Sequence, residues 1–193
     1  MTDRLQVDGL ATMRQQAVAA SLGAVRMRSM DEQQRSFLKD EFFNCTIRGA
    51  FQRARVYTAE ATDNGREGFR EALRSSLEQL EAHYREPVED EDHIRNIEIL
   101  STRLSIDHAE VLVAGRFRIG VAQKTLNLYL KYLWCIGGVS TPPHCPFDAY
   151  IIGELGLSDN WTTVDSLDRY REWVKAAKKK AKSTPLARVR RRG

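Results

Sequence analysis

The sequence has few cysteines and no long hydrophobic run, and each absence excludes a class of protein. Its 193 residues include only three cysteines, Cys45, Cys135 and Cys145. This odd and sparse set does not suit a disulfide framework and indicates a reducing compartment. No apolar stretch reaches the roughly twenty residues that span a bilayer, and the first thirty residues contain no apolar segment typical of secretion signals. We therefore expect a cytoplasmic protein that does not enter membranes.

Metal-binding spacing is also lacking. Cys135, His144 and Cys145 lie in one part of the sequence, but no C-x-x-C pair is present. Zinc sites are usually built on such closely spaced ligands. We expect buried thiols and a structural histidine rather than a metal site, and no motif implies a cofactor.

Strand-like alternation is scarce, and apolar residues instead recur at three- and four-residue steps, which is typical of helices. Hydrophobic residues make up 42% and charged residues 29%, the balance of a globular domain. We predict a compact, all-α, multi-helix domain over residues 1–174, of unknown oligomeric state. The expected helices cover residues 31–59, 66–84, 92–104, 108–114 and 124–134, one that Thr163 or Asp165 caps, and one in the first thirty residues.

Acidic residues are absent from the C-terminal end. Residues 175–193 hold nine of the thirty Lys and Arg, which leaves twenty-one basic against twenty-six acidic residues elsewhere in a chain of net charge +4. A segregated cationic end attracts polyanions, because each neutralised phosphate releases counterions. We interpret residues 175–193 as a basic tail, which either contacts nucleic acid or only improves solubility.

One internal segment suggests a phosphate site. A glycine, Gly120, is expected between the helix at 108–114 and the helix that contains Lys124, with Arg116 and Arg118 just before it. The first turn of a helix presents unpaired backbone N–H groups and a partial positive charge, which together bind anions. Two helices joined by a tight hairpin at Gly120 would therefore hold a nucleic-acid backbone.

This segment resembles a known family. Residues 120–127, GVAQKTLN, are similar to the helix–hairpin–helix of the endonuclease III-type DNA glycosylases, which reads LPGVGxKTAN, and Asp148 follows before an apolar helix. The resemblance covers about a fifth of the chain. It implies that DNA is the partner, that Lys124 is the nucleophile and that Asp148 is the catalytic carboxylate. The phosphate contacts that it implies are Arg116, Arg118, Gly120, Ala122, Gln123 and Thr125.

The chemistry explains the two residue types. A carboxylate stabilises the cationic sugar that forms when a base leaves, and a lysine amine can form an imine with the sugar. Lys124 and Asp148 should then lie on the rim of one cleft, on the order of 4–9 Å apart. The base must leave the stack and enter a pocket, for which we expect Trp134, His144 and Phe147.

Other interpretations are open. Lys124 is otherwise an ordinary helix lysine, and Asp148 a cap of the helix that begins at Ala149. Arg103 and His108 have the Arg-x4-His spacing that resembles the HEPN-type ribonucleases. A non-enzymatic, helical module that binds nucleic acid or protein is a further alternative.

Overall fold

The computed structural model describes residues 30–182 and 185–188, which contain six α-helices and four short 3-10 helices. Within these residues there is no strand, only an isolated bridge between Tyr57 and Leu112. The prediction of an all-α fold is confirmed, while the helix expected in the first thirty residues falls outside the described residues. The α-helices are α2 (Glu32–Phe51), α3 (Asp63–Glu81), α4 (Asp90–Asp107), α5 (Ile119–Cys135), α6 (Ala149–Glu154) and α7 (Leu167–Ala181).

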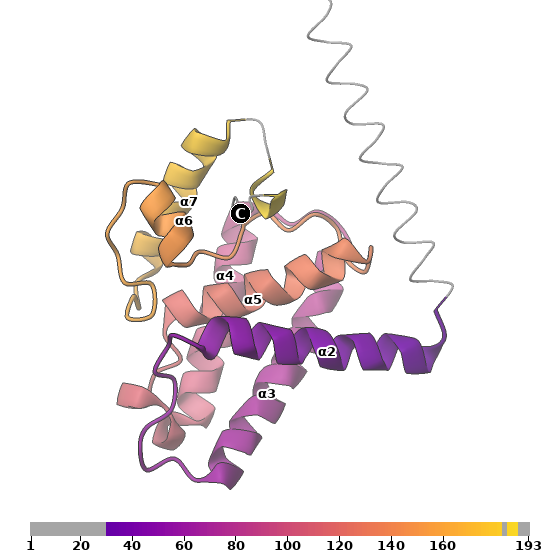
Figure 1. The fold of residues 1–193 in the computed structure, drawn as a ribbon, viewed down its shortest axis with the longest axis vertical. Helices are drawn as coiled ribbons and strands as arrows, with labels where there is room; N and C mark the ends of the chain where they lie inside the picture. The colour runs from indigo at the N-terminus through magenta and orange to yellow at the C-terminus, as the bar shows by residue number, and fades with distance from the viewer. Residues whose placement is uncertain (1–29, 183–184, 189–193) are drawn as a thin grey trace, which may run out of the picture.

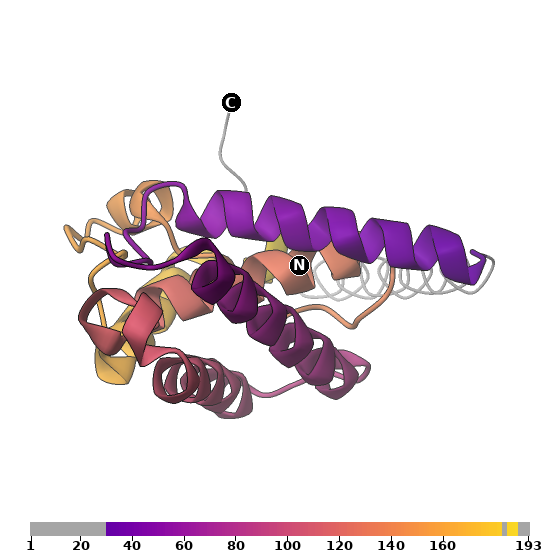
Figure 2. The same ribbon diagram turned by 90° about the horizontal axis from the view of Figure 1, so that it is seen from below.

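Helix α5 is the central element, and it contacts α2, α3, α4 and α7. In Figure 1, α2 lies along α5, and Figure 2 shows α2 on the opposite side of the molecule from α4. Every residue from 119 to 127 is buried. None of the described helices is both long enough and apolar enough to cross a membrane.

Helices α3 and α4 follow from their apolar stripes. The Thr62 side chain caps α3 by accepting the Gly65 N–H, and the residues at three- and four-residue steps are buried. Three acids, at positions 90 to 92, occupy the first turn of α4, where the helix dipole favours negative charge. Both helices confirm the sequence prediction. The buried stripe of α3 consists of Phe69, Leu73, Leu77 and Leu80.

Helix α2 begins where the sequence predicts and ends earlier. Asp31 and Gln34 form a reciprocal capping box at its start. The helix was expected to reach residue 59, but it ends at Phe51. The reason is tertiary: Thr58 N–H donates to Val111 O (3.0 Å) and Val113 N–H donates to Val56 O (3.0 Å), so this backbone is bonded across to a distant segment.

Helix α5 ends at a glycine that adopts a left-handed conformation. Gly137 has φ 75°, a value that costs glycine little. The Gly137 N–H donates to Trp134 O (3.0 Å) and the Gly138 N–H to Leu133 O (2.9 Å), which is the Schellman arrangement. The chain therefore leaves α5 at this stop signal.

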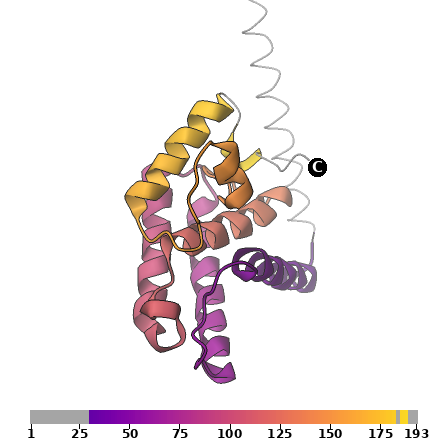
Figure 3. The same ribbon diagram turned by 60° about the vertical axis from the view of Figure 1, so that its left-hand side comes forward.

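Helix α7 crosses the predicted boundary between residues 174 and 175. Ala177 is buried in it, and Leu186 and Ala187 beyond it are also buried. The first part of the expected tail therefore belongs to the domain. Ser166 caps α7, in place of the predicted Thr163 or Asp165. Figure 3 shows α6 and α7 together on the side of α5 away from α3.

Candidate functional site

The segment before α5 does not form the predicted helix–hairpin–helix element. Residues 108–118 contain two 3-10 turns, Ala109–Val111 and Val113–Gly115, where an α-helix was expected. Gly120 is the second residue of α5 rather than part of a hairpin. The Ile119 N–H donates to Asp165 Oδ1 (3.1 Å) and the Gly120 N–H to Val164 O (2.9 Å). These two amides are used inside the protein and are not presented to a phosphate.

Gly120 is required for close approach of two segments. A Cβ at this position would lie 1.8 Å from Trp161 O, so only glycine lets residues 161–165 pack on the first turn of α5. The arginines predicted to bind phosphate flank this packed start. Arg116 Nε and Nη2 bind the two carboxylate oxygens of Asp165 at 2.9 and 3.3 Å, and Arg118 is the N-cap residue of α5.

The remaining predicted DNA contacts lie in the core. Gly120, Ala122, Gln123 and Thr125 are all buried. The Gln123 side-chain amide donates to Gly120 O and to Phe147 O, and the Thr125 hydroxyl donates to Val121 O. These residues were predicted to touch DNA, but the structure buries them and uses the polar side chains of Gln123 and Thr125 inside the protein.

The predicted base pocket is also part of the core. Phe147 is fully buried against the Tyr170 and Trp173 rings, and the buried His144 ring bonds to the Tyr170 hydroxyl through Nδ1 (2.8 Å). Trp134 is half-buried at the far end of α5. None of the three predicted pocket residues lines the cleft that holds Lys124.

His144 belongs to a chain of buried polar side chains that joins α4, α5 and α7. His93 bonds to the Tyr84 hydroxyl through Nδ1 (2.7 Å) and to Asn127 Oδ1 through Nε2 (3.0 Å), and Asn127 donates to the Tyr170 hydroxyl (3.3 Å). Burial lowers the pKa of His93 well below its ordinary value, and burial together with nearby Lys178 lowers the pKa of His144 to about 3. Both rings are therefore neutral near pH 7.

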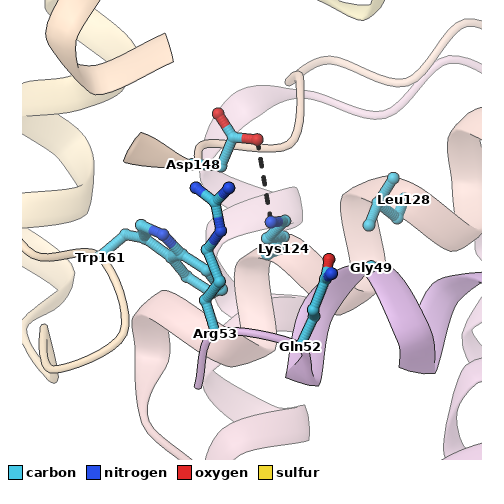
Figure 4. A pocket seen from close by; sticks show the side chains of 7 residues that line it. All are labelled: Gly49, Gln52, Arg53, Lys124, Leu128, Asp148 and Trp161. Atoms are coloured by element: carbon cyan, nitrogen blue, oxygen red, sulfur yellow. Dashed lines mark ion pairs between the residues drawn. The ribbon is translucent and has the colours of Figure 1, made fainter. Parts of the chain in front are cut away.

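Lys124 and Asp148 share one cleft of about 210 Å³ (Figure 4). Lys124 Nζ lies 3.8 Å from Asp148 Oδ2, and their side chains are 10% and 16% exposed. The two groups line one cleft, as predicted, but their separation of 3.8 Å lies below the predicted range of about 4–9 Å. The lining residues are Gly49, Gln52, Arg53, Lys124, Leu128, Asp148 and Trp161.

Each group of the pair also has a structural role. Asp148 Oδ1 accepts the N–H groups of Tyr150 and Ile151 (both 3.1 Å), so Asp148 is the N-cap of α6, as the alternative interpretation proposed. Lys124 Nζ lies 4.2 Å from the centre of the Trp161 ring, a cation–π distance. The cap uses one carboxylate oxygen and leaves the other beside the lysine.

Sequence reasoning missed five residues of this cleft, Gly49, Gln52, Arg53, Leu128 and Trp161. Gln52 and Arg53 follow the last residue of α2, and Trp161 lies in the segment that covers Gly120. No local motif marks any of them, because packing of distant segments brings them to Lys124.

The ribonuclease-like pair is not brought together. Arg103 donates to Gln79 Oε1 (3.3 Å) and lies 3.9 Å from the Asp107 carboxylate, whereas the His108 ring packs against Phe69 at 5.7 Å. The two clefts beside Arg103 are not lined by His108. The arrangement does not place an arginine and a histidine on one reacting phosphate.

The described residues contain no group of three or more His, Cys, Asp or Glu placed to hold a metal ion. Comparison of the chain with protein-family models, with curated proteins and with solved structures finds no match.

Proposed function

We propose that this cleft removes a damaged or modified base from DNA, with Lys124 as the attacking amine and Asp148 as the carboxylate that takes its proton. The observation that carries the proposal is the placement of the two groups 3.8 Å apart on the wall of one cleft. The resemblance to the endonuclease III-type glycosylases suggests the same two residues. The proposal does not use the hairpin of that family, because Gly120 is covered by Trp161.

The pair supplies what the reaction needs. Lys124 Nζ gives a proton to Asp148 Oδ2 and forms a bond to the sugar C1′. The bond from C1′ to the base breaks, and the base leaves with the electron pair and takes up the proton. The nitrogen lone pair then opens the sugar ring to give an imine, with a proton added to O4′. Once Asp148 has passed this proton to the leaving base, its carboxylate is again negative and stabilises the positive charge on the sugar–lysine imine.

The cleft also has a suitable size and lining. Its volume of about 210 Å³ is below that of pockets for drug-sized ligands, which suits a single sugar or base. An enzyme that acts on a base in a duplex must first take the nucleotide out of the stack, and such sites offer flat aromatic walls. Trp161, only 2% exposed, supplies a fixed ring at the wall, next to Lys124.

The test is covalent trapping on DNA. The protein is incubated with a panel of lesion-bearing and abasic oligonucleotides, with and without borohydride, which reduces an imine to a stable amine. We expect a protein–DNA adduct with the wild-type chain and none with Lys124→Gln. Lys131→Gln is the matched control, since Lys131 lies in the same helix and does not line the cleft.

The outcomes separate the alternatives. An adduct of equal yield with Lys124→Gln would show that another amine reacts. Base release without trapping would assign a water-using reaction in which Asp148 acts as the base. DNA binding with neither trapping nor release on any lesion would leave a non-enzymatic nucleic-acid-binding module and end the proposal.

A further inference from the structure

The C-terminal end of α2 forms one wall of the Lys124 cleft. A Cβ at Gly49 would lie 3.0 Å from Leu128 Cδ1, so α2 and α5 approach closely at this point. The close approach brings Gln52 and Arg53, which follow the last residue of α2, to the mouth of the cleft. In Figure 4 the Arg53 side chain rises beside the Trp161 ring, and its guanidinium points to the side where Lys124 and Asp148 meet.

The charges of the cleft do not balance. Arg53 and Lys124 carry two positive charges, Asp148 carries one negative charge, and the other lining residues are uncharged. Lys124 lies beside Asp148 at 3.8 Å and both side chains are largely covered. Arg53 is exposed at the rim, so the excess positive charge faces a ligand that enters from solvent.

From this arrangement we infer that Arg53 holds a phosphate next to the sugar that Lys124 attacks. The ligand class is then a sugar aldehyde that carries a phosphate, as an abasic site in DNA does. This inference rests on the proposed function, and it names the group that replaces the missing hairpin. A guanidinium suits the role because its planar fork binds two phosphate oxygens at once, which a lysine ammonium does not do.

The position of Arg53, just after the C-terminal end of α2, is one where a side chain has to supply the positive charge. The C-terminal end of a helix carries a partial negative charge, which favours a cation there and disfavours a bare anion. The positive charge for the phosphate must therefore come from a side chain, and Arg53 is the charged residue that lines the cleft at that end. The start of α5, the usual kind of anion site, is covered by residues 161–165.

The test changes the phosphate and the arginine separately and together. Three abasic oligonucleotides are compared. One has natural phosphates, one has a neutral methylphosphonate on the 5′ side of the abasic sugar, and one has it on the 3′ side. The rate of borohydride trapping is measured for the wild-type chain and for Arg53→Gln. Arg55→Gln is the matched control, since Arg55 is also exposed and does not line the cleft. Free deoxyribose 5-phosphate and deoxyribose form a second arm.

We expect one methylphosphonate, and Arg53→Gln, each to slow trapping about tenfold to a hundredfold, the scale of a lost hydrogen bond to a charged group. The double change should be no slower than either single change, because one interaction is removed twice. Arg55→Gln should match wild type on every substrate. Two results would overturn the role of Arg53. One is that Arg53→Gln traps the natural oligonucleotide as fast as wild type, and the other is that a methylphosphonate slows trapping by Arg53→Gln as much as it slows trapping by wild type.

The proposed function and the inference fail in different ways. If the wild-type chain traps no oligonucleotide but traps deoxyribose 5-phosphate in preference to deoxyribose, base excision from DNA is refuted and the phosphate role of Arg53 is supported. If trapping of the abasic oligonucleotide is efficient but indifferent to every phosphate change, the proposed chemistry is supported and the inference on Arg53 is refuted.

Discussion

Replacing Gly120 by alanine should destabilise the protein more than a single added methyl group suggests. The new Cβ would lie 1.8 Å from Trp161 O, 2.9 Å from Trp161 C and 3.2 Å from Val164 O. All three atoms belong to the backbone, so no side-chain rotation relieves the contact. Overpacking costs about 1–3 kcal/mol, and separating the Gly120 N–H from Val164 O costs about 1 kcal/mol more. Better helix propensity returns about 0.5–1 kcal/mol.

The net loss should therefore be about 1–3.5 kcal/mol, which for a chain of this length lowers Tm by about 2–14 °C. Thermal and urea unfolding, followed by circular dichroism, measure it. Gly68→Ala is the matched control, because Gly68 lies inside α3 and a Cβ there meets nothing within 4 Å. We expect that variant to be slightly more stable than wild type. If Gly120→Ala were as stable as wild type, residues 161–165 would not sit on α5 as described.

Three other perturbations test the cap, the buried histidines and the end of the chain. Asp148→Asn and Asp148→Ala should both slow excision about 10²-fold, but only the Ala variant should lose about 1 kcal/mol of cap stability; equal stability would contradict the cap. Because His93 and His144 are buried neutral, the unfolded chain binds more protons below its histidine pKa of about 6.5. The free energy of unfolding should then fall as pH drops from 6.5 towards 3, by about 1.4 kcal/mol per unit from His144, with a further loss in the same direction from His93; flat urea midpoints over this range would refute it. Deleting residues 189–193, with three arginines, should reduce the salt dependence of log Kd for DNA by about 3 and preserve the fold; an unchanged slope would show that these residues do not contact phosphate.

Most of the fold could be predicted because its helices carry their own signals. The stripe of α3 is a local pattern that forms as expected, and α2 begins where the sequence predicts. The errors lie where a distant segment decides the backbone. Residues 56–58 have no local reason to leave a helix, but their hydrogen bonds to residues 111 and 113 hold them outside one.

The candidate site divides in the same way. Lys124 and Asp148 could be selected because a short string and a following aspartate are visible in the sequence, and packing places them together. Gly120 was misinterpreted because the sequence does not distinguish a glycine required by a hairpin from a glycine required by a close contact between segments. Arg53 and Trp161 could not be found, since α2 and the segment before α7 reach the cleft only through the packing around α5.

Asp148 shows why a structural and a chemical interpretation of one residue need not compete. Its Oδ1 holds two N–H groups at the start of α6, which fixes the carboxylate in place, and its Oδ2 faces Lys124 at 3.8 Å. A catalytic carboxylate must be held rigidly to act on a developing charge without reorganising, and a helix cap supplies that rigidity. Helix α6 has only six residues, so it depends on its cap for stability. The same Asp148 side chain therefore determines both the start of α6 and the distance to Lys124. The cap and the pair thus depend on one side-chain orientation, and a substitution that keeps the oxygen but removes the charge separates them.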